Sequence, residues 1–151
     1  MLGLLLALNV SVAAGAGSSE DFLGVQVQAR QGRFALFAAT GPLMLGGLLG
    51  DNGPTYSASF GVRWYSSDEG GRFFLSAQWA FFKQQTCHGS CGDREFPPTW
   101  ELYQTATLVA GWRFKWTSFF VDAGIGGGLF FQTGFSPAPI PDATLALGWE
   151  F

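Results

Sequence analysis

The sequence predicts an all-β protein, an eight-stranded antiparallel up-and-down transmembrane β-barrel, and three observations support this fold class. Large apolar side chains alternate with small or polar ones along most of the chain, which places them on one face of each strand. The composition combines 48% hydrophobic and 17% aromatic residues with only 13% charged residues, whereas a soluble domain has roughly 25% charged residues. From Asp21 onward no apolar run approaches the roughly 18 residues of a spanning helix. Without such helices, a closed barrel is the structure that pairs every backbone polar group inside a membrane.

The length and the charge of the chain narrow the class of protein further. Its 151 residues fit one domain over residues 1–151. The net charge of −3 comes without a basic run, so nucleic acid is not an expected partner. The run Gly126-Gly127-Gly128 lies in a strand-like context and precedes no helix, so it is not a phosphate-binding loop. We therefore expect no cofactor.

The amino-terminal segment Met1–Gly17 has two interpretations. As a signal-peptide remnant it has an apolar centre and a small-residue end, but no Lys or Arg precedes the apolar stretch. As a strand, it alternates larger apolar residues with small and polar ones from Leu6 to Gly15. Single-chain bacterial barrels have an even number of strands, and the residues from Phe22 onward supply seven. This parity favours a first strand over Leu5–Ala16 and implies that the export signal is missing from this chain.

The second, third and fourth strands are predicted over Phe22–Arg30, Arg33–Thr40 and Thr55–Trp64. The second strand alternates apolar residues with Gln26 and Gln28, and the fourth alternates them with hydroxyl-bearing and small residues. The apolar faces of these two strands carry Leu23, Val25, Val27, Tyr56, Ala58, Phe60, Val62 and Trp64. Because neighbouring residues of a strand point to opposite sides, the polar residues are expected to share the face that lines the lumen.

Four further strands complete the predicted barrel, over Arg72–Phe82, Trp100–Phe114, Ser118–Gln132 and Asp142–Phe151. Each repeats the alternation over about ten residues or more, which is enough for a tilted strand to cross an outer membrane. The last strand shows the period most clearly, because its large residues alternate strictly with small or polar ones. These large residues are Leu145, Leu147, Trp149 and Phe151.

Short and long connections alternate between the predicted strands. The short ones are Arg30–Arg33, Ser66–Gly71 and Lys115–Thr117, and the long ones are Gly41–Pro54, Gln84–Thr99 and Thr133–Pro141. All 7 prolines fall in the long connections, as expected of a residue that cannot donate to a strand ladder. Short periplasmic turns and longer external loops are the usual asymmetry of transmembrane barrels.

Aromatic residues gather toward the ends of the predicted strands. The clearest examples are Trp64, Trp100, Trp112, Trp149 and Phe151. Amphipathic rings prefer the level of the lipid headgroups, so we expect these residues to form interfacial girdles.

Four charged residues are expected inside the narrow lumen that eight strands enclose. Arg63 and Arg113 shortly precede short turns, Asp122 shortly follows one, and Glu150 lies near the same end of the last strand. Unpaired charges there would be costly, so the sequence predicts an ionic network that either fills the barrel or forms a gated path for protons or small ions. The glycines expected on the same face, leaving room for Arg63, Arg113 or Tyr103, are Gly124, Gly126 and Gly128.

Two cysteines lie close together in the long connection Gln84–Thr99. Their segment reads Cys87-His88-Gly89-Ser90-Cys91, and in an oxidising compartment it predicts a small loop disulfide between Cys87 and Cys91. His88 between the two thiols leaves a metal site as the alternative. Three potential ligands fall short of the four that a tetrahedral site requires, so no metal is expected.

The closing segment Leu147-Gly148-Trp149-Glu150-Phe151 and the repeated strand pattern together resemble the small eight-stranded bacterial outer-membrane barrels of the OmpA and OmpX type. The resemblance implies a monomer in the lipopolysaccharide-containing outer membrane of a Gram-negative cell. It also implies that the carboxy-terminal strand is the signal for the barrel-assembly machinery. The expected role is a structural, adhesion or loop-mediated binding role without enzymatic activity or a wide pore, and the ligand of the external loops is unknown.

Three alternative functions stay open on the sequence alone. A lipid A-modifying barrel enzyme would need a base and a hydroxyl at the membrane surface, and the chain offers only His88 beside Ser90 and Asp93. A soluble lipocalin-like carrier would turn the apolar face inward around a ligand. A narrow ion channel is compatible with the lumen of eight strands, whereas diffusion of large solutes is disfavoured.

Overall fold

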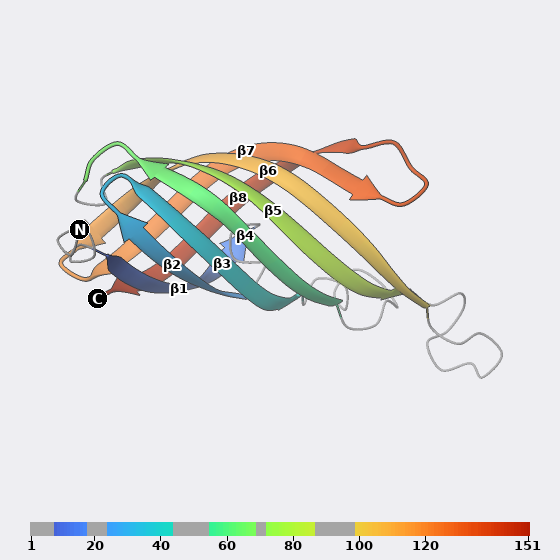
Figure 1. Cartoon of the computed structure of the whole chain (residues 1–151), viewed down its shortest axis with the longest axis horizontal. Coiled ribbons are helices and arrows are strands. Elements are labelled where there is room, and N and C mark those ends of the chain that lie inside the picture. The colour runs from blue at the N-terminus through green and yellow to red at the C-terminus, as the bar shows by residue number, and fades with distance from the viewer. Residues whose placement is uncertain (1–7, 18–23, 44–54, 69–71, 87–98) are drawn as a thin grey trace, which may run out of the picture.

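The computed structural model describes residues 8–17, 24–43, 55–68, 72–86 and 99–151, and these residues form a closed barrel (Figure 1). Neighbouring strands pair antiparallel in the order β1 to β8, and β1 closes the ring against β8. The strands are β1 (Asn9–Gly17), β2 (Gly24–Gln31), β3 (Phe34–Leu43), β4 (Thr55–Tyr65), β5 (Phe73–Thr86), β6 (Thr99–Trp116), β7 (Phe119–Gln132) and β8 (Ala138–Glu150). The predicted fold class is therefore confirmed. Within the described ranges, no helix is long and apolar enough to cross a membrane.

The structure describes the strand β1 within the amino-terminal segment. Strand β1 pairs with β2 from Asn9–Arg30 to Gly15–Gly24 and with β8 from Ser11–Glu150 to Gly17–Thr144. Its larger side chains face outward and its small ones inward, because Val10 and Val12 are exposed while Ser11 and Ala13 are buried. Residues 1–7, which include the first part of the predicted strand, lie outside the described residues.

The two ends of the barrel differ in the connections that they carry. At one end, here called the turn end, short connections join β2 to β3, β4 to β5 and β6 to β7. At the opposite end, here called the loop end, β3–β4 and β5–β6 have the longest connections, residues 44–54 and 87–98. The β7–β8 connection is shorter than predicted, residues 133–137, because β8 begins at Ala138 rather than at Asp142. Strands β5 to β8 run further toward the loop end than β1 to β3 (Figure 1). The β2–β3 turn depends on Gly32, whose φ of 57° lies in the left-handed region.

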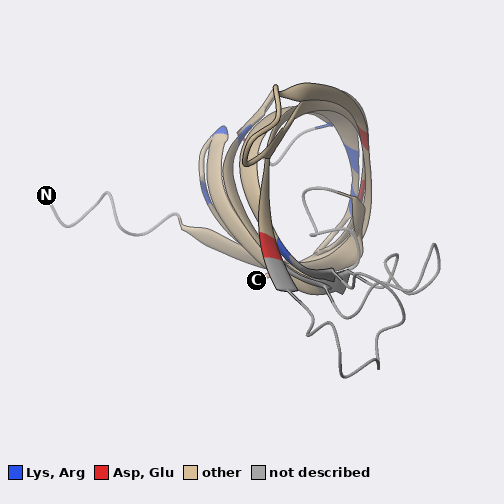
Figure 2. Cartoon of the chain, turned by 90° about the vertical axis from the view of Figure 1, so that its right-hand side faces the viewer, with Lys and Arg blue, Asp and Glu red and all other residues tan. Residues whose placement is uncertain are grey.

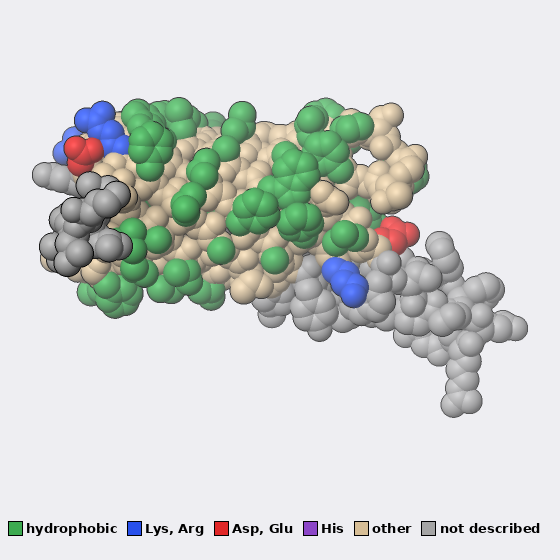
Figure 3. Space-filling view, viewed as in Figure 1, with side chains coloured by type: hydrophobic (Ala, Val, Ile, Leu, Met, Phe, Trp, Pro, Cys, Tyr) green, Lys and Arg blue, Asp and Glu red, His purple; other side chains and the backbone are tan. Residues whose placement is uncertain are grey.

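The barrel is apolar outside and polar inside. On the outer wall Ile125 is 75% exposed and Leu108 is 68% exposed. Hydrophobic side chains are spread over the face of the wall that Figure 3 shows, between the two ends of the barrel. The lumen instead buries amides, hydroxyls and charges, and Gln26, Gln28 and Arg63 are each at most 2% exposed. A soluble carrier barrel has the opposite arrangement, with its apolar side chains around an internal ligand.

Inward-facing aromatic rings pack over glycines of the next strand, a feature that the alternation did not predict. In each case the ring and the glycine are direct cross-strand partners, and a Cβ on the glycine would lie under 3 Å from the ring's Cζ. These distances are 2.6 Å for Phe37 with Gly61, 2.3 Å for Phe74 with Gly111 and 2.2 Å for Phe120 with Gly148. Glycine is therefore required opposite each ring, because any side chain would displace it.

The glycines of β7 do not play the role predicted for them. A Cβ on Gly126 would lie 2.0 Å from the backbone oxygen of Leu108, and one on Gly128 would lie 2.0 Å from that of Ala106. At Gly124 the nearest side chain is Val109. These glycines therefore allow β7 to approach the backbone of β6 closely, rather than leave room for an arginine or a tyrosine.

Replacing Gly126 with alanine is expected to destabilise the barrel by about 1–3 kcal/mol, because the new methyl group would push β6 and β7 apart. Gly127→Ala is the matched control, since a Cβ there would point outward and meet its nearest atom at 3.2 Å. Urea unfolding of both variants in the same detergent measures the difference. Equal stability of the two variants would contradict the close approach at Gly126.

Candidate functional site

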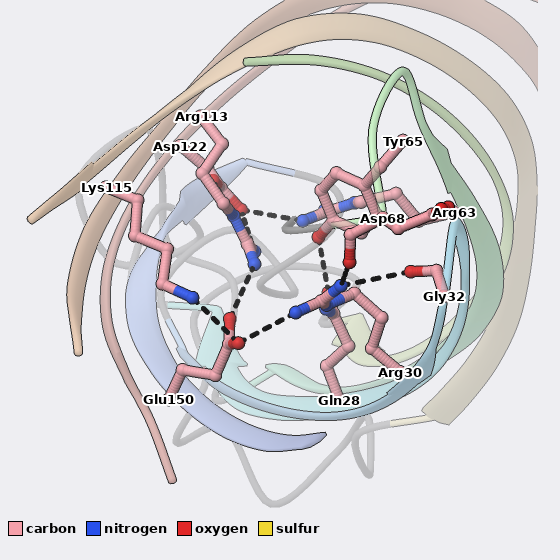
Figure 4. A network of polar contacts seen from close by, with 10 residues as sticks. All are labelled: Gln28, Arg30, Gly32, Arg63, Tyr65, Asp68, Arg113, Lys115, Asp122 and Glu150. Carbon is pink, nitrogen blue, oxygen red and sulfur yellow. Dashed lines mark hydrogen bonds and ion pairs between the residues drawn. The ribbon is translucent and has the colours of Figure 1, made fainter. Parts of the chain in front are cut away.

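The principal polar site is a cluster of six charged side chains inside the turn end of the barrel (Figure 4). Strands β2, β4, β6, β7 and β8 contribute to it. We call it the luminal cluster, and its members are Arg30, Arg63, Arg113, Lys115, Asp122 and Glu150. It includes all four residues of the predicted ionic network.

Asp122 is the centre of one half of the cluster. Arg113, its cross-strand partner, donates from Nε to Oδ1 at 2.6 Å and from Nη2 to Oδ2 at 2.7 Å. Arg63 on β4 reaches the same carboxylate, donating from Nη1 to Oδ2 at 2.7 Å. The three side chains are at most 1% exposed. Such a buried, charge-assisted arrangement holds strands β4, β6 and β7 in fixed relative positions.

Glu150 on the last strand is the centre of the other half. Its Oε1 accepts from Arg30 Nη2 at 2.8 Å and from Lys115 Nζ at 2.9 Å. Its Oε2 lies 3.7 Å from Arg113 Nη1, which connects the two halves. Arg30 also donates to the backbone oxygens of Gly32 and Asp68, so the cluster reaches two turns.

The predicted ionic network lacks Arg30 and Lys115, although the sequence carries a signal for both. Arg30 follows Gln28 by two residues and Lys115 follows Arg113 by two residues, so each shares the inward face of its strand. Both positions lie at a predicted boundary between a strand and a turn. The strands continue one residue beyond each of them, to Gln31 and Trp116.

Aromatic rings cover the guanidinium groups of the cluster. The Cζ of Arg113 lies 3.8 Å from the ring centre of Phe120, and the Cζ of Arg63 lies 4.4 Å from that of Phe74. Tyr65 lies near both Arg113 and Arg30, and its hydroxyl donates to Gln28 Oε1 at 3.0 Å. Contacts between a cation and an aromatic face become stronger when water is excluded, so these rings stabilise the buried charges.

The predicted interfacial aromatics lie on the outer wall where their side chains are described. Trp112, Trp149 and Phe151 are exposed, Trp64 is half-buried, and the side chain of Trp100 lies outside the described residues. Ring contacts connect Trp112 to Phe73, and Phe119 to both Trp116 and Trp149. These rings form a band near the turn end, and their position at a membrane interface stays a prediction.

The predicted loop disulfide lies outside the described residues, because Cys87, Cys91 and His88 all fall within residues 87–98. The pairing of the two cysteines therefore stays a prediction. Over the described ranges, no group of three or more His, Cys, Asp or Glu side chains could hold a metal ion.

The fold, the apolar outer wall and the charged lumen together define a closed eight-stranded barrel that is apolar outside and polar inside. Two solved structures are similar to this chain. The N-terminal β-barrel domain of Pseudomonas aeruginosa OprF has a TM-score of 0.60 and 14% identity, and the match covers 95% of this chain and 96% of that one. Ail, the attachment invasion locus protein of Yersinia pestis, was solved with the heparin analogue sucrose octasulfate. It has a TM-score of 0.52 and 10% identity, with 96% of this chain and 97% of that chain covered.

At these identities the similarity concerns the fold, and it confirms the predicted resemblance to eight-stranded outer-membrane barrels. The sequence matches no protein-family model and no curated protein.

Proposed function

We propose that this chain is a non-enzymatic integral outer-membrane protein with a structural, adhesion or loop-mediated binding role in the cell envelope. The observation that supports the proposal most strongly is the inverted distribution of side chains, with exposed Ile125 and Leu108 outside and buried Arg63 and Asp122 inside. In water this arrangement would expose a continuous apolar belt, whereas in a bilayer the belt meets lipid tails. Barrels similar in fold, OprF and Ail, support the same conclusion.

The connections suggest how the barrel is oriented in the membrane. Outer-membrane barrels carry short turns on the periplasmic side and longer loops outside. We therefore place the turn end, with the luminal cluster, toward the periplasm and the loop end toward the exterior. Insertion by the barrel-assembly machinery through β8, a monomeric state and contact with lipopolysaccharide at the loop end belong to this proposal.

The luminal cluster argues against a wide pore. Arg63, Arg113 and Asp122 reach from β4 to β7 across the lumen and are at most 1% exposed (Figure 4). Eight strands leave little space beyond these side chains. We therefore expect the protein to conduct no large solutes, and the role of the cluster is to fill and close the barrel.

The loop end is the surface that we propose for recognition, and its charge bears on the class of ligand. The Ail structure holds a sulfated sugar analogue, and a ligand of that kind favours a basic surface. Toward the loop end, the charged residues of the described ranges are Lys83, Glu101 and Asp142, an excess of negative charge. Figure 2 views the barrel from this end. The net negative charge of these three residues does not favour a sulfated ligand.

Ile125→Lys tests the membrane assignment directly. If Ile125 faces lipid near mid-wall, the lysine is expected to destabilise the inserted barrel by about 2–4 kcal/mol. If the barrel is soluble, the same change places a charge in water and leaves stability within about 0.5 kcal/mol. The effect is measured by titrating the protein with urea in phospholipid vesicles. The folded fraction at each urea concentration is read from the gel mobility of unheated samples.

The matched control for this test is Phe135→Lys. Phe135 is 70% exposed in the connection between β7 and β8, so the proposed orientation places it outside the bilayer. A tolerated Ile125→Lys in a protein that stays monomeric without detergent would overturn the outer-membrane proposal.

A further inference from the structure

A groove on the outer wall extends from the turn end of the barrel, where Phe34 begins strand β3. It has a volume of about 370 Å³ and crosses strands β3 to β7. Small outward residues, Ala77 and Ala110, form part of its lining, together with larger ones such as Val62, Leu75, Leu108 and Ile125. The side chains that line it on the outward face of the wall are almost all apolar. In the proposed membrane location, this face contacts lipid.

The strand register shows how the groove is directed. Phe34, Trp64, Leu75, Ala110 and Ile125 follow one another as direct cross-strand partners from β3 to β7. Phe34 is the first residue of β3, at the turn end, whereas Ile125 lies midway along β7. Because strands of a transmembrane barrel are tilted, this row climbs obliquely from the rim of the barrel toward the middle of its wall.

Two exposed arginines directly precede strands β3 and β5, which line the groove, at the turn end of the barrel. Arg33 directly precedes Phe34, and its side chain is half-exposed while Nε pairs with Asp68 at 3.0 Å. Arg72 is exposed immediately before β5. Figure 3 shows basic and acidic side chains gathered at the turn end, next to the hydrophobic wall. No ion pair to the Arg72 side chain is found within the described ranges.

We propose that the groove and the two arginines form a binding site for one anionic phospholipid, with an acyl chain along Ala77 and Ala110 and the headgroup phosphate at Arg72 and Arg33. The proposal rests on the proposed membrane location. An acyl chain matches an elongated apolar groove that begins at the headgroup level, and a phosphate complements arginine at that level. Together these features favour a phospholipid of the leaflet at the turn end.

The two parts of the site contribute differently to selectivity. Bulk lipid tails are as apolar as the groove, so the groove selects by shape and by close contact rather than by hydrophobicity. A basic residue near the membrane surface favours an anionic headgroup by about fivefold, and Arg72 is expected to supply most of this preference because Arg33 is already paired with Asp68. We therefore expect an anionic phospholipid to bind about fivefold more tightly than a zwitterionic one with the same chains.

The test uses the folded full chain in detergent, titrated with phosphatidylglycerol or phosphatidylcholine of identical acyl chains. Native mass spectrometry counts the lipids retained on the barrel. We expect one phosphatidylglycerol to be retained in preference to phosphatidylcholine by the unmodified protein. Arg72→Gln should abolish that preference, and Ala77→Leu, which fills the groove, should lower retention of both lipids several-fold.

Two control variants separate the site from general effects. Lys83→Gln removes an exposed charge of β5, toward the end of that strand opposite Arg72. Ala58→Leu enlarges an outward alanine of β4 that does not line the groove. Both should retain lipid like the unmodified protein. Since Arg72→Gln changes only an exposed side chain, it keeps the test decisive if Ala77→Leu fails to fold.

Equal retention of the two lipids by the unmodified protein, or unchanged preference in Arg72→Gln and Arg33→Gln, would overturn the site. This failure differs from a failure of the proposed function. If only the lipid site is wrong, the protein still requires detergent to stay folded, as measured by circular dichroism and heat-dependent gel mobility. If the proposed membrane function is wrong, the protein is a folded monomer without detergent.

Discussion

Asp122→Ala is expected to lower the free energy of unfolding by about 3–5 kcal/mol. Asp122 bonds to both Arg63 and Arg113, and all three side chains are at most 1% exposed. Its removal would leave two guanidinium groups buried without their shared counter-ion, and desolvation of an unpaired charge is expensive. Equilibrium unfolding in urea, with the protein in phospholipid vesicles and tryptophan fluorescence as the signal, measures the loss.

Asp68→Ala is the control for this prediction, because it also removes one aspartate of an arginine pair. The side chains of Arg33 and Asp68 are 51% and 72% exposed, and exposed pairs contribute about 0.2–1 kcal/mol. A loss at Asp122 no larger than that at Asp68 would contradict the view that the luminal cluster stabilises the barrel. Asp122→Asn keeps the shape of the side chain, so it should lose most of the same stability if charge is the cause.

The strands and their two faces were predictable from the sequence because both follow from a local rule. Alternation assigns every residue of a strand to one of its two sides. The low content of charged residues, without a run long enough for a spanning helix, predicts a membrane barrel, and the polar side of each strand then faces the lumen. This reasoning placed Arg63, Arg113, Asp122 and Glu150 on the inner face near the same end. The structure brings these four within one cluster because their distances from the short turns are similar.

The aromatic rings inside the lumen were not predictable by the same rule. Phe37, Phe74 and Phe120 occupy inner positions in strands whose inner face was expected to be polar or small. Each ring fits because a glycine lies directly across on the next strand, so its position depends on register between strands. The glycines themselves were visible in the sequence, but a pattern within one strand does not show which residue lies opposite.

Cluster members at strand ends were missed for a related physical reason. Turns are rich in polar residues, so the sequence does not show where the alternation of apolar and polar residues in a strand ends. Arg30 and Lys115 therefore resemble turn residues in the sequence. In the folded barrel the strands extend past them because the turns are tight, with Gly32 and Thr117 at positive φ. Both side chains consequently point into the lumen and reach Glu150.

Phe120→Ala is expected to destabilise the barrel by about 3–5 kcal/mol, since it removes a buried aromatic ring and leaves a cavity. The ring is 1% exposed, packs over Gly148 and lies 3.8 Å from the Cζ of Arg113. The variant therefore also removes the aromatic face that covers a buried guanidinium. Urea unfolding in vesicles measures the change, and Leu147→Ala, on the exposed outer face beside Gly148, serves as control.

The pairing of Phe120 with Gly148 makes a sharper prediction for two substitutions combined. Gly148→Ala alone should cost about 1–3 kcal/mol, because its Cβ would meet the ring Cζ at 2.2 Å. In the Phe120→Ala background the same methyl group enters the space left by the ring, so its cost should fall toward zero or become a gain. The expected coupling between the two sites is about 1–3 kcal/mol. Additive losses would mean that the glycine is needed for close approach of the β7 and β8 backbones rather than for the ring, and the aromatic–glycine pairing would then not explain this position.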